Sequence, residues 1–594
     1  MNDTNKINRL LCFSMLFLCA NVFAQWSVLD NDKRFLLNKS ESYLYQPFTD
    51  EQWNSSNFAT EKEMKWFKDA RYGMFIHFGL SSYVSKDLSW PIVYTRKAPD
   101  QGHGEYPESV WTKWPEKFKL EKFNADEWVK IAQEAGQKYI VVIAKHHDGF
   151  HMWDTKYSEF KITNTPFGRD YIKEIADACH KAKMPFGFYY SQRDWYHPDY
   201  APVDPNTIKQ ISDPPYYQAL PGKKVAPGSS HSKYIDYQYK AIEELCTKYG
   251  KIDIFWFDAV YWGGMFTADM WDSENLTRMI RRLQPGIIIN NRASIPGDFD
   301  TPEQRIGMYQ KRPWESAMTL NGSWAYSPEP KIRSVKSLLQ EMLSAASGNG
   351  NVLLSWGAHW NGEFDGAQKD TLLAVGKWLK NNGEAYYGTN GGPWMPSKNY
   401  GSVYSNKKIY IYVYNWDKEK LSLPRISGNK LLSASFLNSN EKLIYTEKDS
   451  FITFNKPKNP DKLVTVIVLN MINNVSEVQE IKTSTSVFDD PAYGEKFKVV
   501  KLKKTDWKDK NAIIDLHTDK KVTGLSISGN AGTLIISVSK DGKSWENEGT
   551  SSENLGEISI SSFLAGVYIP GKEIRYIKLE NQLKPNLDIT IYSK

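Results

Sequence analysis

The sequence predicts an α/β protein, with a (β/α)8-like TIM barrel domain followed by C-terminal antiparallel β-sandwich domains. From about Trp66 to Thr389, short apolar runs rich in β-branched and aromatic residues alternate with amphipathic helical stretches. Nearly continuous apolar strands separated by helices indicate a parallel sheet covered on both faces. An alternation of this length favours a closed barrel. The alternative is a doubly wound sheet, but no glycine-rich phosphate loop follows the first strand candidate.

The barrel is expected within residues 25–390, and its strand candidates are short. They are, in chain order, "YGMFIHFG", "YIVVIAKHH", "FGFYYSQ", "IDIFWFDA", "GIIINNR", "IGMYQKR" and "GNVLLSWG". Helical patterns between them include "NADEWVKIAQEAGQK" and "RDYIKEIADACHKAK", whose apolar residues recur at helical spacing. Strand and helix therefore follow one another as in β/α units.

Residues 1–24 are expected to be a secretory signal peptide. Lys6 and Arg9 precede the apolar run "LLCFSMLFLCANVF", and Val22-Phe23-Ala24 suits cleavage before Gln25. The run is too short for a comfortable membrane span. The mature chain is thus expected in the periplasm or outside the cell.

Two further units are expected after the barrel, because the helical pattern stops and strand-like runs follow one another through polar turns. Residues 391–471 contain "KKIYIYVYNW", "LLSASFLN" and "KLVTVIVLN", which predicts a β-sandwich. The polar segment "NNVSEVQEIKTSTS" is interpreted as a linker. In residues 485–594, "SVSKDGKSW" followed by "RYIKLE" resembles the discoidin-like (galactose-binding-like) β-sandwiches, with a structural role favoured over sugar binding.

Composition excludes some classes of function. The 594 residues suffice for several domains, and the formal net charge of +6 is dispersed, with no basic block for nucleic acid or membranes. The 21 Trp and 34 Tyr suit the faces of sugar rings, although large cores use them too. Of the four cysteines, Cys179 and Cys246 lie in the mature chain within helical patterns. They are expected to be buried thiols, with a disulfide between them left open.

Polar residues follow the strand candidates one after another, where the carboxyl ends of barrel strands place their chemistry. These strand ends are His77, Lys145–Asp148, Tyr190–Ser191, Asp258 and Asn290–Arg292. Asp258 ends an aromatic run, where a carboxylate is costly unless it is hydrogen-bonded or faces a cleft. The alternative is a strand-end aspartate that caps the next loop. A second carboxylate is sought in the loop "GDFDTPEQR", among Asp298, Asp300 and Glu303.

The adjacent His146 and His147 have three interpretations. They bind a metal, they hold a polar ligand, or they are ordinary core or loop histidines. Metal sites of barrel hydrolases commonly use His-x-His, because alternate strand residues share a face, and no further cysteine or helical histidine pair is at hand. Imidazole nitrogens as partners of sugar hydroxyls fit the pattern better.

Seven motifs in order resemble the α-L-fucosidases of glycoside hydrolase family 29, over about Trp66 to Thr389. They are "WFKDARYGMFIHFG", "FNADEWVKIAQEAGQKYIVVIAKHHDGFHMW", "GFYYSQRDW", "IDIFWFDA", "NNR" with "GDFDTPEQ", "WESAMTLNGSWAY" and "VGKWLKNNGEAYYGT". The resemblance implies an exported retaining glycosidase that removes terminal α-L-fucosyl residues from oligosaccharides or glycoconjugates. It implies no metal and no organic cofactor.

The resemblance also implies roles for individual residues. Asp258 matches the nucleophile, and Glu303 in "TPEQ" is assigned as the acid/base. His77, His146, His147 and Tyr190 match positions that hold the sugar hydroxyls, and Arg292 matches a charged contact. Trp256 and Trp324 would form apolar walls for the ring and the C6 methyl group.

One departure bears on the substrate. The family's segment after the seventh strand usually reads "LLNIGP", whereas this chain has "LLSWGAHW", with Ser355 and Trp356 at the changed positions. An L-galactose-specific relative and a fucose-binding protein without catalysis are the alternatives, beside a metal-dependent hydrolase built on the histidine pair.

Overall fold

The computed structural model describes residues 57–593 with several gaps. The residues outside the description are 1–56, 86–87, 90–105, 201–202, 205–208, 211–230, 259–270, 294, 303–305, 307–312, 329, 395, 397–398, 417–418, 427, 449, 476–494, 529–533, 551–556, 560, 565–566, 582–583 and 594. The expected signal peptide therefore lies outside the described residues. No helix in the described part of the chain is long and apolar enough to cross a membrane.

A parallel sheet forms the first unit, and its strands are ordered β7-β6-β3-β2-β1-β9-β8. They are β1 (Tyr72–Ile76), β2 (Ile140–Lys145), β3 (Phe186–Tyr190), β6 (Ile254–Phe257), β7 (Ile288–Ile289), β8 (Glu315–Thr319) and β9 (Asn351–Trp356). Parallel bridges from Asn290 to Phe299 and from Asp300 to Trp314 link the two edge strands. The segment Phe299–Asp300 thus takes the place of an eighth strand, and the predicted TIM-like barrel followed by antiparallel sheets is confirmed.

One strand prediction did not fall on a described strand. Of "IGMYQKR", all but Ile306 lies outside the described residues, whereas β8 covers the more polar "ESAMT". β8 carries the polar residues Glu315, Ser316 and Thr319, which are buried. They interrupt the apolar run by which a buried strand is recognised in a sequence.

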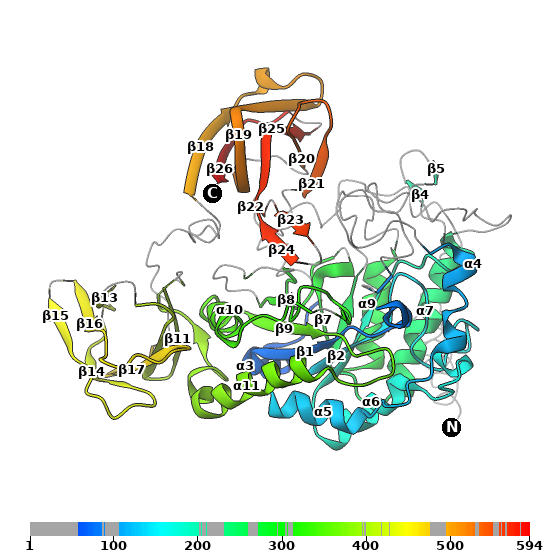
Figure 1. Ribbon diagram of the computed structural model, residues 1–594, viewed down its shortest axis with the longest axis horizontal. Helices are drawn as coiled ribbons and strands as arrows, with labels where there is room; N and C mark the ends of the chain where they lie inside the picture. Colours follow the sequence, from blue (N-terminus) through cyan, green and yellow to red (C-terminus); the bar gives the residue numbers. More distant parts are fainter. Residues whose placement is uncertain are drawn as a thin grey trace, which may run out of the picture.

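The helices lie around the outside of the strands (Figure 1). They are α4 (Glu108–Trp111), α5 (Ala125–Glu134), α6 (Tyr171–Lys181), α7 (His231–Lys248), α9 (Ser273–Leu283), α10 (Val335–Ser347) and α11 (Gly366–Asn382). The two helical patterns predicted from the sequence correspond to α5 and α6. At their starts, the side chains of Asn124 and Asp170 each accept a hydrogen bond from the N–H of the third helical residue. Such caps fix the start of each helix.

The amino-terminal mouth of the barrel is closed by α3 (Glu61–Ala70), which begins at a capping box formed by Thr60 and Glu63. Its residues Met64 and Phe67 join the buried cluster that fills the barrel, beside Tyr139. Because this end is plugged, the carboxyl ends of the strands are the end at which a ligand can enter.

The second unit is antiparallel and packs against the barrel. One sheet contains β10 (Asn390–Gly391), β11 (Tyr400–Ser405), β12 (Lys408–Val413), β14 (Leu431–Phe436) and β17 (Thr465–Met471), and the other contains β13 (Lys420–Pro424), β15 (Tyr445–Lys448) and β16 (Phe451–Asn455). Tyr412 donates a hydrogen bond to the carbonyl of Ala385, and Asn438 donates to Asn382 at the end of α11. One face of the larger sheet therefore joins the core of the barrel, and a separate apolar cluster fills the space between the two sheets.

The third unit has a core of its own. Its main sheet contains β18 (Glu495–Leu502), β19 (Asn511–Ser528), β20 (Ile535–Ser539), β21 (Glu546–Thr550), β25 (Lys572–Glu580) and β26 (Leu587–Ser593), and shorter strands are β22 (Glu557–Ser559), β23 (Ser561–Leu564) and β24 (Val567–Pro570). A short hairpin of the first unit consists of β4 (Val203–Asp204) and β5 (Lys209–Gln210). Cys179 and Cys246 are both buried and both free thiols.

Candidate active site

A pocket opens at the carboxyl ends of the barrel strands. The empty space within it is about 360 Å³, which includes space open to solvent. Its lining residues are Phe75, His77, His146, His147, Tyr189, Trp256, Asp258, Arg292, Ala317 and Trp324. Seven of the predicted site residues, Asp258 among them, are thus brought together around one hollow.

Strand alternation explains why most of these side chains face the pocket. Phe75 and His77 are two residues apart at the end of β1, and Trp256 and Asp258 are two apart at the end of β6. Since successive side chains of a strand point to opposite faces, both members of each pair point inward. Tyr189 pairs in register with Trp256 and faces inward with it, and the two rings stack 5.6 Å apart.

The adjacent histidines both reach the pocket because the strand has ended. β2 stops at Lys145, and its register with β3 shifts between Ile143 and Lys145. His146 and His147 are therefore released from strand alternation, and their rings lie 4.1 Å apart. His146 also stacks on Tyr189, with ring centroids 5.3 Å apart.

A serine stands behind each pocket histidine at Nδ1. Ser355 lies 2.7 Å from Nδ1 of His77 and donates its hydroxyl proton to the carbonyl of Trp324. Because that proton is already used, Nδ1 of His77 must be the donor and Nε2 the acceptor.

The same reasoning holds for His147. Ser191 lies 2.6 Å from Nδ1 of His147 and donates its proton to the carbonyl of Arg193. His147 therefore carries its proton on Nδ1 as well. Ser89 bonds Nδ1 of His146 and also accepts the N–H of Asp148. Each serine thus orients one imidazole.

Burial keeps these imidazoles neutral. It lowers the pKa of His77 to about 3 and holds the pKa values of His146 and His147 well below their usual range, helped by the neighbouring positive charges of Lys145 and Arg193. A neutral imidazole protonated at Nδ1 offers a lone pair at Nε2. His77 and His147 are therefore suited to accept hydrogen bonds from hydroxyl groups.

Asp258 sits at the mouth of the barrel, not in packed apolar material. Tyr189 donates to its Oδ2 at 2.7 Å, and Arg292 donates to its Oδ1 at 3.3 Å. Nε2 of His147 lies 3.9 Å from the same Oδ2. The carboxylate is held in a fixed orientation beside the hollow, as a nucleophile or a charge-stabilising group requires.

Beneath the pocket, a second carboxyl group is enclosed by the barrel. Glu315 is fully buried and accepts from the indole N–H of Trp256 at 3.2 Å and from the hydroxyl of Tyr139. Burial raises its pKa to about 8. Glu315 therefore fixes the ring of Trp256, while Arg292 lies over the same ring at 4.9 Å.

One predicted site residue lies away from the pocket, and another is outside the described residues. Tyr190 is fully buried on the other face of β3, with the ammonium of Lys145 over its ring, and Tyr189 occupies the pocket instead. Glu303 lies outside the described residues. Tyr189 was missed because the end of a strand is uncertain by a residue and each such step exchanges the two faces. Phe75 was missed because the site was sought among polar strand ends, although Phe75 shares the face of His77.

The other loop carboxylates have separate places. Asp298 is buried and is held by Arg281 at 2.8 Å and by the backbone N–H groups of Ala59 and Ile289, so it joins the loop to the barrel. Asp300 forms a bridge with Trp314 in the closing segment. Both oxygens of Asp298 are therefore bonded to the protein, and its role is structural.

The histidine pair and Asp258 could geometrically hold a metal ion, since their ligand atoms lie within 4.8 Å of one another. However, both oxygens of Asp258 already accept from protein donors, and the guanidinium of Arg292 adds a positive charge 3.3 Å away. That charge repels a divalent cation at the same oxygens. The site suits an uncharged polyhydroxy ligand better.

The two residues that differ from the usual family motif, Ser355 and Trp356, lie on opposite faces of β9. Ser355 pairs with Phe75 of β1 and faces inward, where it bonds His77. Trp356 faces outward and stacks on Phe364 in the helical layer. Only Ser355 acts on the pocket.

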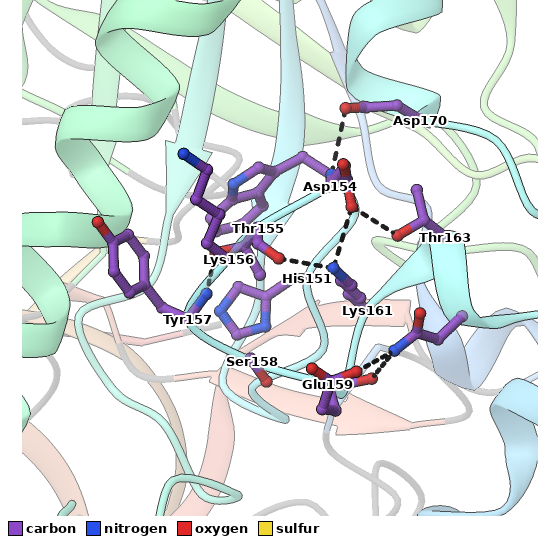
Figure 2. Close-up of polar contacts among 12 residues, drawn as sticks. His151, Asp154, Thr155, Lys156, Tyr157, Ser158, Glu159, Lys161, Thr163 and Asp170 are labelled. Carbon is purple, nitrogen blue, oxygen red and sulfur yellow. Dashed lines mark hydrogen bonds and ion pairs between the residues drawn. The ribbon is translucent and has the colours of Figure 1, made fainter.

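Beyond the histidine pair, the segment 151–170 builds a framework (Figure 2). Asp154 accepts from Lys161 and Thr163 and donates its own N–H to Asp170. His151 is buried, with Nδ1 at 3.2 Å from the carbonyl of Phe160 and Nε2 bonded to the hydroxyl of Tyr237. Both of its nitrogens are thus bound to the protein.

Comparisons with known proteins give a consistent result. A family model described as alpha-L-fucosidase matches residues 39–384, which is more than half of the chain. The curated human plasma alpha-L-fucosidase is 28% identical over 383 residues, covering 59% of this chain and 76% of that protein. An alpha-L-fucosidase of Dictyostelium discoideum is 24% identical over 434 residues, covering 68% and 88%.

Solved structures agree with this match. Alpha-L-fucosidase isoenzyme 1 from Paenibacillus thiaminolyticus is 30% identical, covers 70% of this chain and 99% of its own, and has a TM-score of 0.61. A GH29 alpha-L-fucosidase from Bacteroides thetaiotaomicron, solved as a trapped covalent intermediate, shares the fold at 23% identity and a TM-score of 0.61, covering 72% and 98%.

Proposed function

Since the chain belongs to the alpha-L-fucosidase family, glycoside hydrolase family 29, we propose that it hydrolyses terminal α-L-fucosyl residues of glycans with retention of configuration. The observation that carries the proposal is the carboxylate of Asp258, held by Tyr189 and Arg292 at the edge of a pocket walled by neutral imidazoles and aromatic rings. A carboxylate, hydroxyl acceptors and apolar faces are what cleavage of a deoxysugar requires.

In the first step, an oxygen of Asp258 attacks the anomeric carbon, and the bond to the leaving oxygen breaks with its electron pair. Glu303 gives that oxygen a proton. In the second step Glu303 takes a proton from water, and the water oxygen displaces the carboxylate of Asp258 from the sugar. The anchoring of Thr301, two residues before Glu303, supports this role. Arg292 binds both Thr301 and Asp258.

The pocket walls support a deoxysugar as substrate. His77 and His147 present Nε2 lone pairs to sugar hydroxyls, and Phe75, Trp256 and Ala317 provide apolar surface for a methyl group. A C6 hydroxyl placed against those apolar residues would lose its hydrogen bonds to water, which costs free energy. Fucose is therefore favoured over L-galactose, and turnover of matched aryl glycosides of the two sugars tests that preference.

The deciding experiment compares the wild type with Asp258→Ala on an aryl α-L-fucoside. The variant should lose activity by at least about 10⁴-fold, as expected for a missing nucleophile. Asp154→Ala, which removes an exposed carboxylate outside the pocket lining, is the matched control and should keep its activity. Equal turnover by Asp258→Ala and the wild type would exclude the assigned nucleophile, and binding of fucose without any turnover would favour a sugar-binding protein.

Two further measurements test the remaining roles. Glu303→Ala should slow methyl α-L-fucoside far more than α-L-fucosyl fluoride, because fluoride leaves without a proton. Equal losses on both substrates contradict the acid/base assignment. Activity that survives exhaustive chelation excludes the metal-dependent hydrolase, and activity that chelation abolishes contradicts the present proposal.

The apolar run before Gln25 supports export of the enzyme to the periplasm or the exterior. Amino-terminal sequencing of the protein from expressing cells tests this. A mature chain that begins at Gln25 is expected, and a cytoplasmic protein that keeps Met1 contradicts export.

A further inference from the structure

A row of partly exposed aromatic side chains lies beside the pocket. We call it the aromatic rim. Its members are Tyr83, Trp324, Tyr326, His359 and Trp360, and each is partly exposed. They follow β1, β8 and β9, which are neighbours in the sheet.

Four of the rim rings contact one another in a row, and Trp324, close to Tyr326 in the sequence, connects the row to the pocket. Trp324 lines the pocket and lies 4.9 Å from the ring of His77. Two residues later, Tyr326 contacts His359 at 4.9 Å, and the ring of Trp360 lies 5.3 Å from that of His359. Tyr83 closes the row at 6.3 Å from Trp360.

The backbone is shaped so that these rings can meet. A side chain at Gly357 would place its Cβ 2.1 Å from the backbone nitrogen of Tyr326, so glycine lets the two loops approach. The N–H of Asn361 donates to Nδ1 of His359, which leaves the proton of a neutral ring on Nε2. The rim thus combines flat apolar faces with a hydrogen-bond donor.

The position of the rim relative to Asp258 indicates its ligand. If the closing segment Phe299–Asp300 is counted as the eighth strand, β6 and β9 are four strands apart in either direction around the barrel. The strand that carries Asp258 therefore stands opposite the strand that leads to His359 and Trp360. In a retaining glycosidase the nucleophile attacks the face of the anomeric carbon opposite the leaving group. With Asp258 as the nucleophile, a leaving group on the side of the pocket away from Asp258 would lie toward the rim.

We propose that the aromatic rim is the acceptor subsite, and that it binds the pyranose ring to which the fucosyl residue is attached. Tyr326 and Trp360 present ring faces to the C–H face of that sugar, as aromatic side chains with an apolar face and a polar edge do. This inference rests on the proposed function and deepens it. On this proposal, the natural substrate is an oligosaccharide, and the enzyme contacts the sugar that carries the fucosyl residue.

The experiment compares an α-L-fucosyl disaccharide with methyl α-L-fucoside, because both leave as poor alkoxides and only one carries a second ring. Trp360→Ala and Tyr326→Ala should each lower kcat/KM for the disaccharide about tenfold, the size of one lost ring contact, and leave the methyl glycoside unchanged. Trp360→Phe should recover most of the loss. Tyr157→Ala, which removes an exposed tyrosine of the 151–170 framework (Figure 2), is the control and should change neither substrate.

Two results overturn the acceptor subsite. In one, the rim variants leave disaccharide cleavage unchanged, and in the other they slow both substrates equally, which would make the rim a support of the pocket. Turnover of α-L-fucosyl fluoride by the wild type separates this failure from failure of the proposed function. A wild type that cleaves none of the three substrates removes both proposals, whereas fluoride cleavage with unaffected rim variants removes the subsite alone.

Discussion

The pocket histidines and the nearby His151 are alike in chemistry and burial and differ in a single respect. His77, His146 and His147 are buried and neutral, and each is bonded to a serine at Nδ1 while its ring lines the pocket. His151 is equally buried, and burial lowers its pKa to about 3, but both of its nitrogens are bonded to the protein.

That difference separates binding groups from framework groups. Burial and a lowered pKa are common to both sets and so do not identify a site. What identifies the pocket histidines is that protein partners orient one nitrogen while the ring lines a hollow. We therefore expect losses in the pocket to reduce activity, and losses in the framework to reduce stability.

Among the variants that test this comparison, the largest effect is expected for His147→Ala. The variant loses the imidazole that lies 3.9 Å from Asp258, and the space that it leaves opens into the pocket. The value of kcat/KM on an aryl α-L-fucoside should fall by about 100-fold or more, since a site built to bond hydroxyls loses a buried partner. The melting temperature should change little. A variant that loses stability and keeps its activity would falsify the distinction.

His151→Ala should show the opposite pattern. The hydroxyl of Tyr237 and the carbonyl of Phe160 lose a partner in the interior, and a void is left. We expect the barrel to lose about 2–3 kcal/mol of stability in urea unfolding followed by tryptophan fluorescence. At a temperature where the variant is folded, kcat/KM should stay within about threefold of the wild type. A collapse of kcat/KM in the folded variant would place His151 among the groups that act on the sugar.

Glu315→Gln extends the comparison to a buried carboxyl group. Burial raises the pKa of Glu315 from 4.5 to about 8, so the folded protein holds this proton more tightly than the unfolded chain does. The resulting stability is present in full below pH 4.5 and is lost as the pH rises through about 8. Glutamine has no such proton. The stability of the variant relative to the wild type should therefore rise by about 1 kcal/mol or more between about pH 5 and pH 8.5.

Urea midpoints at the two pH values check this prediction. Ser316→Ala, at the neighbouring position of β8, is the control and should leave the pH dependence unchanged. Parallel curves for the wild type and Glu315→Gln would show that Glu315 is ionised throughout this range. The loss of activity in Glu315→Gln is expected to be modest, because Trp256 keeps a carbonyl acceptor for its indole N–H.

The barrel and the polar residues at its strand ends could be predicted from the sequence for a simple physical reason. An apolar run that stops at Asp258 or at His146 shows both the strand and the place where it meets the mouth. The face of a strand is harder to predict. Tyr189 and Tyr190 are chemically alike, and only the pairing of Tyr189 with Trp256 shows which of them faces inward.

Other features depend on contacts between distant parts of the chain. β8 was missed because Glu315 and Thr319 interrupt its apolar pattern, and the partners of Glu315 come from β6 and from Tyr139, far away in the sequence. Ser355 was recognised as a departure, but its contact with His77 follows from the register between β1 and β9. A sequence pattern carries no such register.

Ser355→Ala is the smallest and most specific test of the comparison. The variant removes the acceptor that keeps the proton of His77 on Nδ1, so part of the protein will carry it on Nε2, where it cannot accept from a sugar hydroxyl. We expect kcat/KM on an aryl α-L-fucoside to fall about 5–10-fold, the effect of one net hydrogen bond. Ser355→Thr, which keeps the hydroxyl, should retain activity. The ¹⁵N shifts of His77 measure the tautomer directly, and unchanged shifts in Ser355→Ala would mean that the serine does not set it. Because a purely structural loss would not move the proton between the ring nitrogens, these shifts separate orientation of the imidazole from simple packing.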